Sequence, residues 1–240
     1  NGQSWYDLIG AVSPANANTL VIGGVDMLKT TDAGISWAQI SQWSSGCGGI
    51  NNVHADIHTI IYYNNSVTDL ISTNDGGVYY SPDGGSTWQA KNTGYNVTQF
   101  YAVDAHPTNS NFFLAGAQDN GSHRFNTAGV NSTTRVTGGD RAYCHIDQKD
   151  GQIQITSYVY NNYYFSRNGG TSFSTVPDGT SSTGDFINPT EYDDEKDVLY
   201  TSTIISQYGL VTGLAGSGTP VYQTVSLPDL IQPASAFKVD

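Results

Sequence analysis

Two stretches, Thr30-Thr31-Asp32-Ala33-Gly34-Ile35-Ser36-Trp37 and Ser81-Pro82-Asp83-Gly84-Gly85-Ser86-Thr87-Trp88, share one pattern. Each has a hydroxyl residue, Asp two positions later, Gly two positions after that, and a final pair of hydroxyl residue and Trp. A third stretch, Ser166-Arg167-Asn168-Gly169-Gly170-Thr171-Ser172-Phe173, has Asn for Asp and Phe for Trp. Asp or Asn near Gly favours a tight turn, because its side-chain oxygen accepts backbone N–H groups and Gly takes positive φ. Three copies in register indicate a repeat fold.

The spacing of these copies predicts the size of the repeat. The first two copies begin 51 residues apart, and the second and third begin 85 apart. The longer interval is close to two shorter repeats with one copy lost, and residues 125–129 offer a degenerate turn there. A four-stranded propeller blade needs roughly 40–50 residues. Alternating apolar segments then predict five blades and the start of another, over residues 5–40, 57–90, 100–137, 142–176, 186–226 and 236–240.

The repeated stretches resemble the Asp-box (BNR) repeat of sialidase-like β-propellers. The residues that carry this resemblance are Asp32, Gly34, Trp37, Asp83, Gly85, Trp88, Asn168, Gly170 and Phe173. Residues 53–58, 74–79, 117–122 and 138–140 extend the resemblance to secreted bacterial propellers of the Vps10/sortilin-type and family-74 glycosidase-like groups. The resemblance implies an all-β propeller of four-stranded antiparallel blades, secretion to the extracellular space or cell surface, and membership of a larger protein. It does not fix a function, because this group contains both glycosidases and binding modules.

The number of predicted blades suggests an incomplete ring. Residues 1–240 are expected to form a single propeller domain or a fragment of one, as part of a ring of six to eight blades. Propellers have typically four to eight blades and close by pairing strands from both ends of the chain. An unclosed ring would expose apolar flanks. Further blades, a second domain or partner chains are therefore expected to cover those flanks.

The composition supports a secreted all-β protein and excludes several partners. The chain has 27 Gly and 16 Tyr, and its charged residues make up 12% against about 25% in typical soluble proteins. Its net charge is −12, from 9 Lys and Arg against 21 Asp and Glu. This acidic balance argues against binding to nucleic acid or to an anionic membrane surface. No apolar run approaches the roughly 20 residues of a membrane-spanning helix.

Two cysteines, Cys47 and Cys144, are too few for a disulfide scaffold. They fall two predicted blades apart. Two partly buried thiols are favoured, and pairing in an oxidising compartment is the alternative.

Propeller topology predicts where a site would lie. The loop that enters the first strand of a blade shares one face with the hairpin between its second and third strands, and the repeated turns lie on the opposite face. Asp56, Asp140 and Asp185 each precede the first strand of a blade. We therefore expect them to cluster at one mouth of the central channel, as the candidate catalytic residues. The same face is expected to carry a ligand-binding set of His54, His58, Asn74, Asp75, Asp119, Asn120 and Arg141.

The residues of this predicted site also have other interpretations. Asp75 and Asp119 lie in Gly-containing turns, where Asp is favoured by turn chemistry alone. His54, Asp56 and His58 alternate, so on an extended strand they would point the same way and could bind a transition metal. A hydrogen-bonded channel histidine is the commoner outcome, and no metal site is predicted there. No cofactor is expected, although clustered carboxylates could recruit a cation such as calcium.

Three functions fit these features. We expect a glycan- or protein-recognition module, with Tyr95, Tyr143, Tyr158, Tyr160 and Tyr208 available to stack on sugar rings. The alternative is a family-74-like glycoside hydrolase that uses two of the three aspartates as acid and base. The third is a purely structural module of a surface assembly. Sialidase activity is not expected, because the chain has only four arginines and lacks the Arg-Ile-Pro motif.

Overall fold

The computed structural model describes residues 2–44, 51–95, 97–177 and 183–239. The chain divides into two compact units, Asn1–Val97 (the first unit) and Thr98–Asp240 (the second unit), and each is described by itself. In the described residues, all regular structure is strand except one 3-10 turn, η1 (Tyr63–Asn65). The prediction of an all-β fold built from four-stranded antiparallel propeller blades is confirmed. No described helix is long and apolar enough to cross a membrane.

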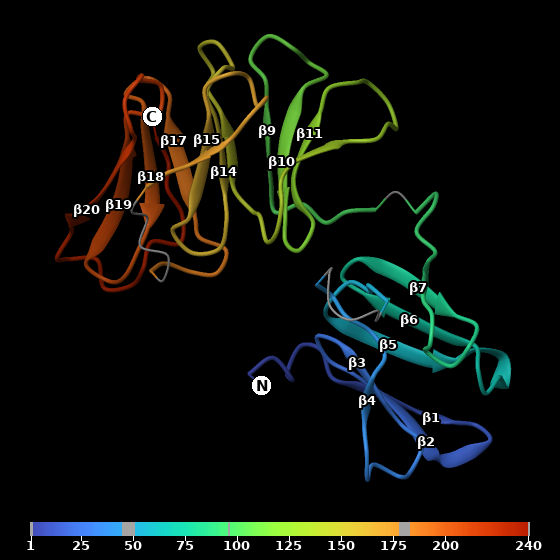
Figure 1. Cartoon of the computed structure of the whole chain (residues 1–240). Coiled ribbons are helices and arrows are strands. Elements are labelled where there is room, and N and C mark those ends of the chain that lie inside the picture. Colours follow the sequence, from blue (N-terminus) through green and yellow to red (C-terminus); the bar gives the residue numbers. More distant parts are fainter. Residues whose placement is uncertain (1, 45–50, 96, 178–182, 240) are drawn as a thin grey trace. The chain divides into compact units, whose positions relative to one another are not determined.

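The first unit contains two antiparallel sheets whose strands follow one another in chain order. Figure 1 shows them in blue and teal. Apolar side chains of both sheets meet in one core, which includes Val21, Met27, Ile57 and Leu70, each fully buried. The strands are β1 (Ile9–Ser13), β2 (Asn16–Gly23), β3 (Met27–Thr30) and β4 (Ala38–Gln39), followed by β5 (Ile57–Tyr62), β6 (Leu70–Asn74), β7 (Gly77–Ser81) and β8 (Gln89–Ala90).

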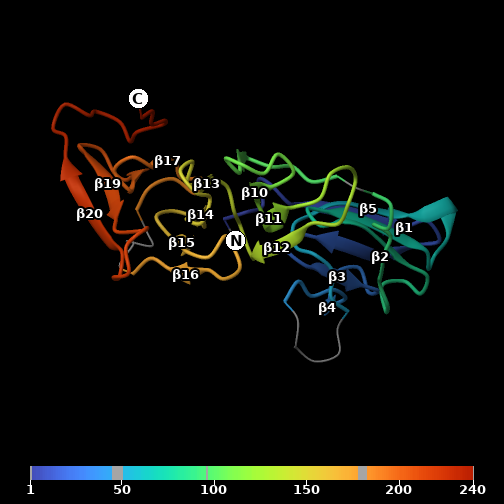
Figure 2. The ribbon, with the colours of Figure 1, turned by 90° about the horizontal axis from the view of Figure 1, so that it is seen from above.

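The second unit contains three such sheets, which stand next to one another in chain order in Figures 1 and 2. One apolar core, including Ile155, Tyr163 and Leu199, joins the last two sheets. A smaller one around Leu114 and Ile146 joins the first two. The strands are β9 (Ala102–Ala105), β10 (Phe113–Ala117), β11 (Gly121–Phe125), β12 (Thr134–Thr137), β13 (Cys144–Ile146), β14 (Gln154–Ser157), β15 (Tyr163–Ser166), β16 (Ser174–Thr175), β17 (Thr190–Asp193), β18 (Val198–Ser202), β19 (Gln207–Thr212) and β20 (Val221–Ser226).

The structure differs from the predicted blade ends in two places. The first blade was expected to begin with a strand at residue 5, but residues 2–6 form turns and β1 begins at Ile9. Residues 236–239 were expected to start a further blade, but they form no strand. Instead, the Phe237 ring stacks on Tyr200 of β18, with ring centroids 6.5 Å apart. A ring–ring contact with the last sheet, rather than strand pairing, therefore holds this segment. That residues 1–240 form a single propeller domain or a fragment of one, as part of a ring of six to eight blades, remains a prediction.

Hydrogen bonds between the same motif positions close the three repeated turns. In residues 81–88, one carboxylate oxygen of Asp83 accepts from the Thr87 N–H at 2.8 Å, and the other accepts from the Thr87 hydroxyl at 2.7 Å. The Ser81 hydroxyl donates to Asp83 and accepts from the Gly85 N–H at 2.8 Å. Asp32 makes the corresponding bonds in residues 30–37. In residues 166–173, the Asn168 side-chain oxygen accepts from the Ser166 hydroxyl and the Ser172 N–H, and its amide nitrogen donates to the Ser172 hydroxyl. The first hydroxyl, the Asp or Asn and the last hydroxyl of the motif therefore act as one turn-closing unit.

Replacing Asp83 by Ala is expected to lower the thermal midpoint by about 2–4 °C, because the Thr87 and Ser81 donors lose their acceptor. Hydrogen bonds from Thr87 hold the pKa of Asp83 below its ordinary value. The stabilisation is thus present above the unfolded pKa and is lost as the pH falls through the folded one. Asp83→Asn should retain most of the stability, since Asn168 closes the third turn, and should lose this acid sensitivity. Differential scanning calorimetry at neutral and acidic pH tests both variants. Equal midpoints for Asp83→Ala and the wild type would refute the turn-closing role.

Cys144 is a free thiol in the core of the second unit. Burial raises its pKa to about 12. This outcome agrees with the favoured expectation for Cys144, whereas Cys47 lies outside the described residues.

Candidate functional site

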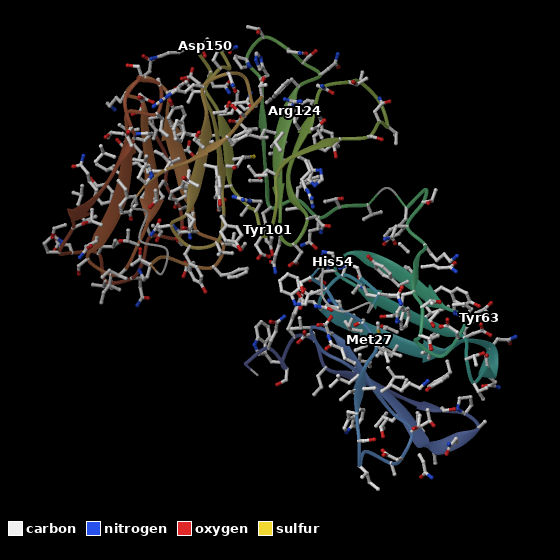
Figure 3. The ribbon with its side chains drawn as sticks, viewed as in Figure 1. Met27, His54, Tyr63, Tyr101, Arg124 and Asp150 are labelled. Carbon is white, nitrogen blue, oxygen red and sulfur yellow. The ribbon has the colours of Figure 1, made fainter. Side chains whose placement is uncertain are left out.

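In the first unit, the segment that enters β5 and the β6–β7 hairpin lie at the same end of the β5–β8 sheet, as the topology predicted. Figure 3 shows His54 at this end and Tyr63 at the opposite end. The N-terminal turns reach the same end, because Gln3 and Tyr6 contact Asp56 and Asp75. We define the entry face of the first unit by residues 3–7, 54–58 and 74–76.

Three carboxyl groups are linked on this face. The Gln3 amide donates to Asp56 at 2.6 Å and to Asp7 at 3.4 Å. A carboxylate oxygen of Asp56 lies within 4.8 Å of one of Asp75. Asp7 and Asp56 are buried, with 3% and 8% of their surface exposed. Asp75 is half-buried and is therefore the carboxylate of the three most open to a ligand.

The carboxyl groups of Asp56 and Asp75 have different surroundings. Burial, and then the negative charges of Asp75 and Asp7, raise the pKa of Asp56 above its ordinary value. Asp75 instead accepts hydrogen bonds from the Tyr6 hydroxyl at 2.9 Å and from the His58 ring at 2.6 Å. Asp56 is thus a carboxyl group that holds its proton more strongly than an ordinary Asp, and it lies beside the hydrogen-bonded carboxylate of Asp75.

Exposed aromatic rings border the carboxyl groups. Trp5 is 84% exposed, and its ring centroid lies 5.7 Å from that of Tyr6. Tyr6 in turn meets the His58 ring edge-on at 5.0 Å. The entry face of the first unit therefore combines apolar ring surface with hydrogen-bond acceptors and an imidazole.

The alternative in which His54, Asp56 and His58 point the same way does not hold, because the backbone is not extended at Asp56. Asp56 has a φ of 65°, in the left-handed region, and β5 begins only at Ile57. His54 packs on Gly76, His58 turns to Asp75, and Asp56 turns to Gln3. Among the described residues, these three are not a group with metal-ligand spacing. Asn74 is buried, and its oxygen accepts from the Gly76 N–H at 3.0 Å, which is turn chemistry.

The second unit brings another part of the predicted set together. The Asp119 N–H donates to the Asp140 carboxylate at 3.2 Å, so the β10–β11 hairpin lies beside the entry of β13. The Tyr101 hydroxyl donates to Gln118 of the same hairpin at 2.6 Å, and Asn120 is tied to the Gln118 carbonyl. Figure 3 shows Tyr101 at one end of the unit and Asp150, in the β13–β14 hairpin, at the other. The Tyr101 end of the second unit therefore also combines aromatic, amide and carboxylate groups.

Arg141 is buried rather than open to a ligand, with 4% of its surface exposed. Its guanidinium donates to the carbonyls of Gly138 and Ser157 and lies over the rings of Tyr158 and Tyr164, at 4.8 and 4.2 Å. These contacts hold the entry loop of β13 against the sheet, so the Arg141 side chain positions that loop. A direct contact between Arg141 and a ligand stays a prediction.

Asp185 is exposed, and its backbone N–H donates to Asn188 at 3.0 Å. Of the tyrosines predicted for stacking, Tyr160 meets Phe186 edge-on and Tyr208 stacks on Tyr200, whereas Tyr95 is 58% exposed. The clustering of Asp56, Asp140 and Asp185 stays a prediction.

Sequence reasoning missed Gln3, Trp5, Tyr6 and Asp7, because it assigned the segment to a strand. An aromatic pair next to Asp ahead of the first strand was the available signal.

Comparisons with known proteins find similarity among solved structures. The chain matches no protein-family model. It also matches no curated protein. Among solved structures it is similar to an ancestral GH74 enzyme (14% identity, TM-score 0.43) and to the GH74 xyloglucanase from Xanthomonas campestris (12%, 0.37). It is also similar to YCF48 bound to D1 peptide (15%, 0.40).

The alignments cover 91%, 91% and 89% of this chain in that order, but 31%, 38% and 66% of the other chains. The chain thus spans less than two thirds of the length of these proteins. The likeness concerns the fold alone.

Proposed function

We propose that this chain is an extracellular recognition module that binds a neutral, hydroxyl-rich glycan on the entry face of its first unit. The observation that carries the proposal is the entry face of the first unit, where Trp5 and Tyr6 border Asp75 and His58. Flat aromatic rings stack on the C–H faces of sugars, while carboxylate and imidazole groups bind the hydroxyls. The net charge of −12 argues against an anionic glycan.

The second unit supports the same function. At the end of this unit where the entry loop of β13 lies, Tyr101 and Gln118 lie beside the Asp119–Asp140 pair. Placement outside the cell is proposed from the low content of charged residues and the abundance of Tyr and Gly.

Replacing Trp5 by Ala is expected to weaken glycan binding about tenfold, since the loss of one stacked ring corresponds to roughly 1.4 kcal/mol. Affinity electrophoresis through gels that contain soluble neutral polysaccharides would measure the retardation. Tyr63→Ala is the matched control, because Tyr63 is 53% exposed at the opposite end of the same sheet. Equal loss in both variants, or binding of a basic peptide in place of every glycan, would refute the proposal.

A second candidate function is glycoside hydrolysis by Asp56 and Asp75. The specific observation is their separation, within 4.8 Å between oxygens, together with the raised pKa of Asp56. Retaining glycosidases place their two carboxyl groups roughly 5–5.5 Å apart and give the acid a raised pKa. Release of reducing ends by the wild-type chain, abolished in Asp56→Asn, would favour hydrolysis. Glycan binding without release would favour recognition.

A further inference from the structure

A cavity of about 350 Å³ lies in the second unit, and none of the residues of the proposed glycan site lines it. Its wall is formed by residues of β9, β13 and β17, which are the first strands of three consecutive sheets. Ligand sites have volumes of roughly 300–1,000 Å³, so this space suits a small molecule or one side chain of a partner.

The lining is acidic and has no opposite charge. Asp104, Glu191 and Asp194 contribute to the wall, whereas no Lys or Arg does. His145 also lines the cavity, but burial lowers its pKa to about 4, so its ring is neutral at pH 7. Its Nε2 atom is hydrogen-bonded to the Thr190 hydroxyl at 2.9 Å.

The three carboxylates differ in how firmly they are held. Asp104 accepts from the Ile146 N–H at 2.6 Å and the Ala105 N–H at 2.8 Å, so it is fixed between β9 and β13. Asp194 accepts from the Gln148 N–H at 3.2 Å. No described residue donates a hydrogen bond to the carboxylate of Glu191 or pairs with it. Burial, followed by the charge of Asp104, raises the pKa of Glu191, as expected of a carboxylate that lacks a counter-ion.

The spacing disfavours a metal ion. Among the residues that the structure describes, no three of the cavity's Asp, Glu, His or Cys side chains bring ligand atoms within 4.8 Å of one another. A single Ca²⁺ ion needs six to eight oxygens at 2.3–2.6 Å. An organic cation is larger and can donate to separated carboxylates, and Tyr143 and Tyr192 supply aromatic surface beside it.

We propose that this cavity binds an organic cation, an alkylammonium or guanidinium group, through Glu191, Asp104 and Asp194. Glu191 is the carboxylate with hydrogen-bonding capacity to spare, whereas Asp104 sets the geometry of the wall. The cation could belong to a free amine or to a Lys or Arg side chain of a partner protein, because both present the same donors.

Saturation-transfer NMR on the full chain tests this proposal with cadaverine as the probe and 1,5-pentanediol as its neutral analogue. Cadaverine should bind and the diol should not. Glu191→Gln keeps the side-chain shape and should raise the apparent Kd about tenfold, the size expected for a lost charge-assisted hydrogen bond. Glu195→Gln is the matched control, because Glu195 is an exposed carboxylate that does not line the cavity. It should change the Kd less than twofold.

A second arm distinguishes the source of the cation. A lysine-containing tripeptide with blocked termini should compete with cadaverine if a partner side chain is the ligand, and should fail to compete if only a small free amine fits. Either result supports the site. Three outcomes would overturn it: no binding of cadaverine, equal weakening in Glu191→Gln and Glu195→Gln, or displacement of cadaverine by CaCl₂ but not by NaCl of equal ionic strength.

Discussion

Replacing Gly116 by Ala is expected to destabilise the second unit by about 3 kcal/mol or more, a cost at the upper end for overpacking. A Cβ atom at Gly116 would lie 2.1 Å from the carbonyl oxygen of Ala142 and within 2.9 Å of its backbone nitrogen. Because these neighbours are backbone atoms, no side-chain rotation relieves the contact. The Arg141 N–H bonds to the Ala117 carbonyl at 3.0 Å, which holds the entry loop of β13 against β10.

Gly138→Ala is the control for this prediction. Gly138 lies in the same entry loop, and a Cβ atom there would meet nothing within 4 Å. Urea unfolding followed by circular dichroism should show a large loss for Gly116→Ala and little change for Gly138→Ala. Similar free energies of unfolding for Gly116→Ala and Gly138→Ala would contradict the close approach of β10 to the entry loop of β13.

Replacing Asn161 by Ala is expected to cost about 3–5 kcal/mol, because three buried donors lose one acceptor. The Asn161 side-chain oxygen accepts from Thr201 at 2.7 Å, from Tyr163 at 2.8 Å and from Asn188 at 2.8 Å. All four residues are buried. The network links the β14–β15 hairpin, between the second and third strands of one sheet, to β18 and the entry of β17 in the neighbouring sheet.

Asn162→Ala is the matched control, because the half-buried Asn162 amide makes a single bond, to the Val159 carbonyl at 2.9 Å. Its loss should cost about 1 kcal/mol. Thermal and urea unfolding of both variants would compare the two costs. An Asn161→Ala variant no less stable than Asn162→Ala would mean that water or a relaxed side chain replaces the missing acceptor.

The sequence predicted the sheets because its strongest signals are local. Each repeated turn is closed by residues two to four positions apart, such as Ser81, Asp83 and Thr87, so the motif alone determines the geometry. Strand alternation between these turns is also local. The topology predicted that the entry loops share a face with the hairpins between second and third strands. The hydrogen bond from the Asp119 N–H to Asp140 agrees with that prediction.

The remaining features depend on contacts that no local pattern encodes. The positive φ of Asp56 reverses the alternation that would have aligned His54 with His58. Gln3 reaches Asp56 across 53 positions of the chain, and Phe237 finds Tyr200 in place of a strand partner. The burial of Arg141 results from two tyrosines that belong to a later hairpin and strand. Side chains of this kind gain their roles only after the sheets have packed.

Hydroxyl-radical footprinting with mass spectrometry, with and without a saturating neutral polysaccharide, tests glycan recognition on the entry face of the first unit most directly. Trp5 and Tyr6 are exposed in the free protein and should become protected, whereas Tyr63 at the opposite end should react equally in both states. Protection of Tyr63 with no change at Trp5 and Tyr6 would contradict the account, as would the absence of protection at any of the three while the polysaccharide is bound.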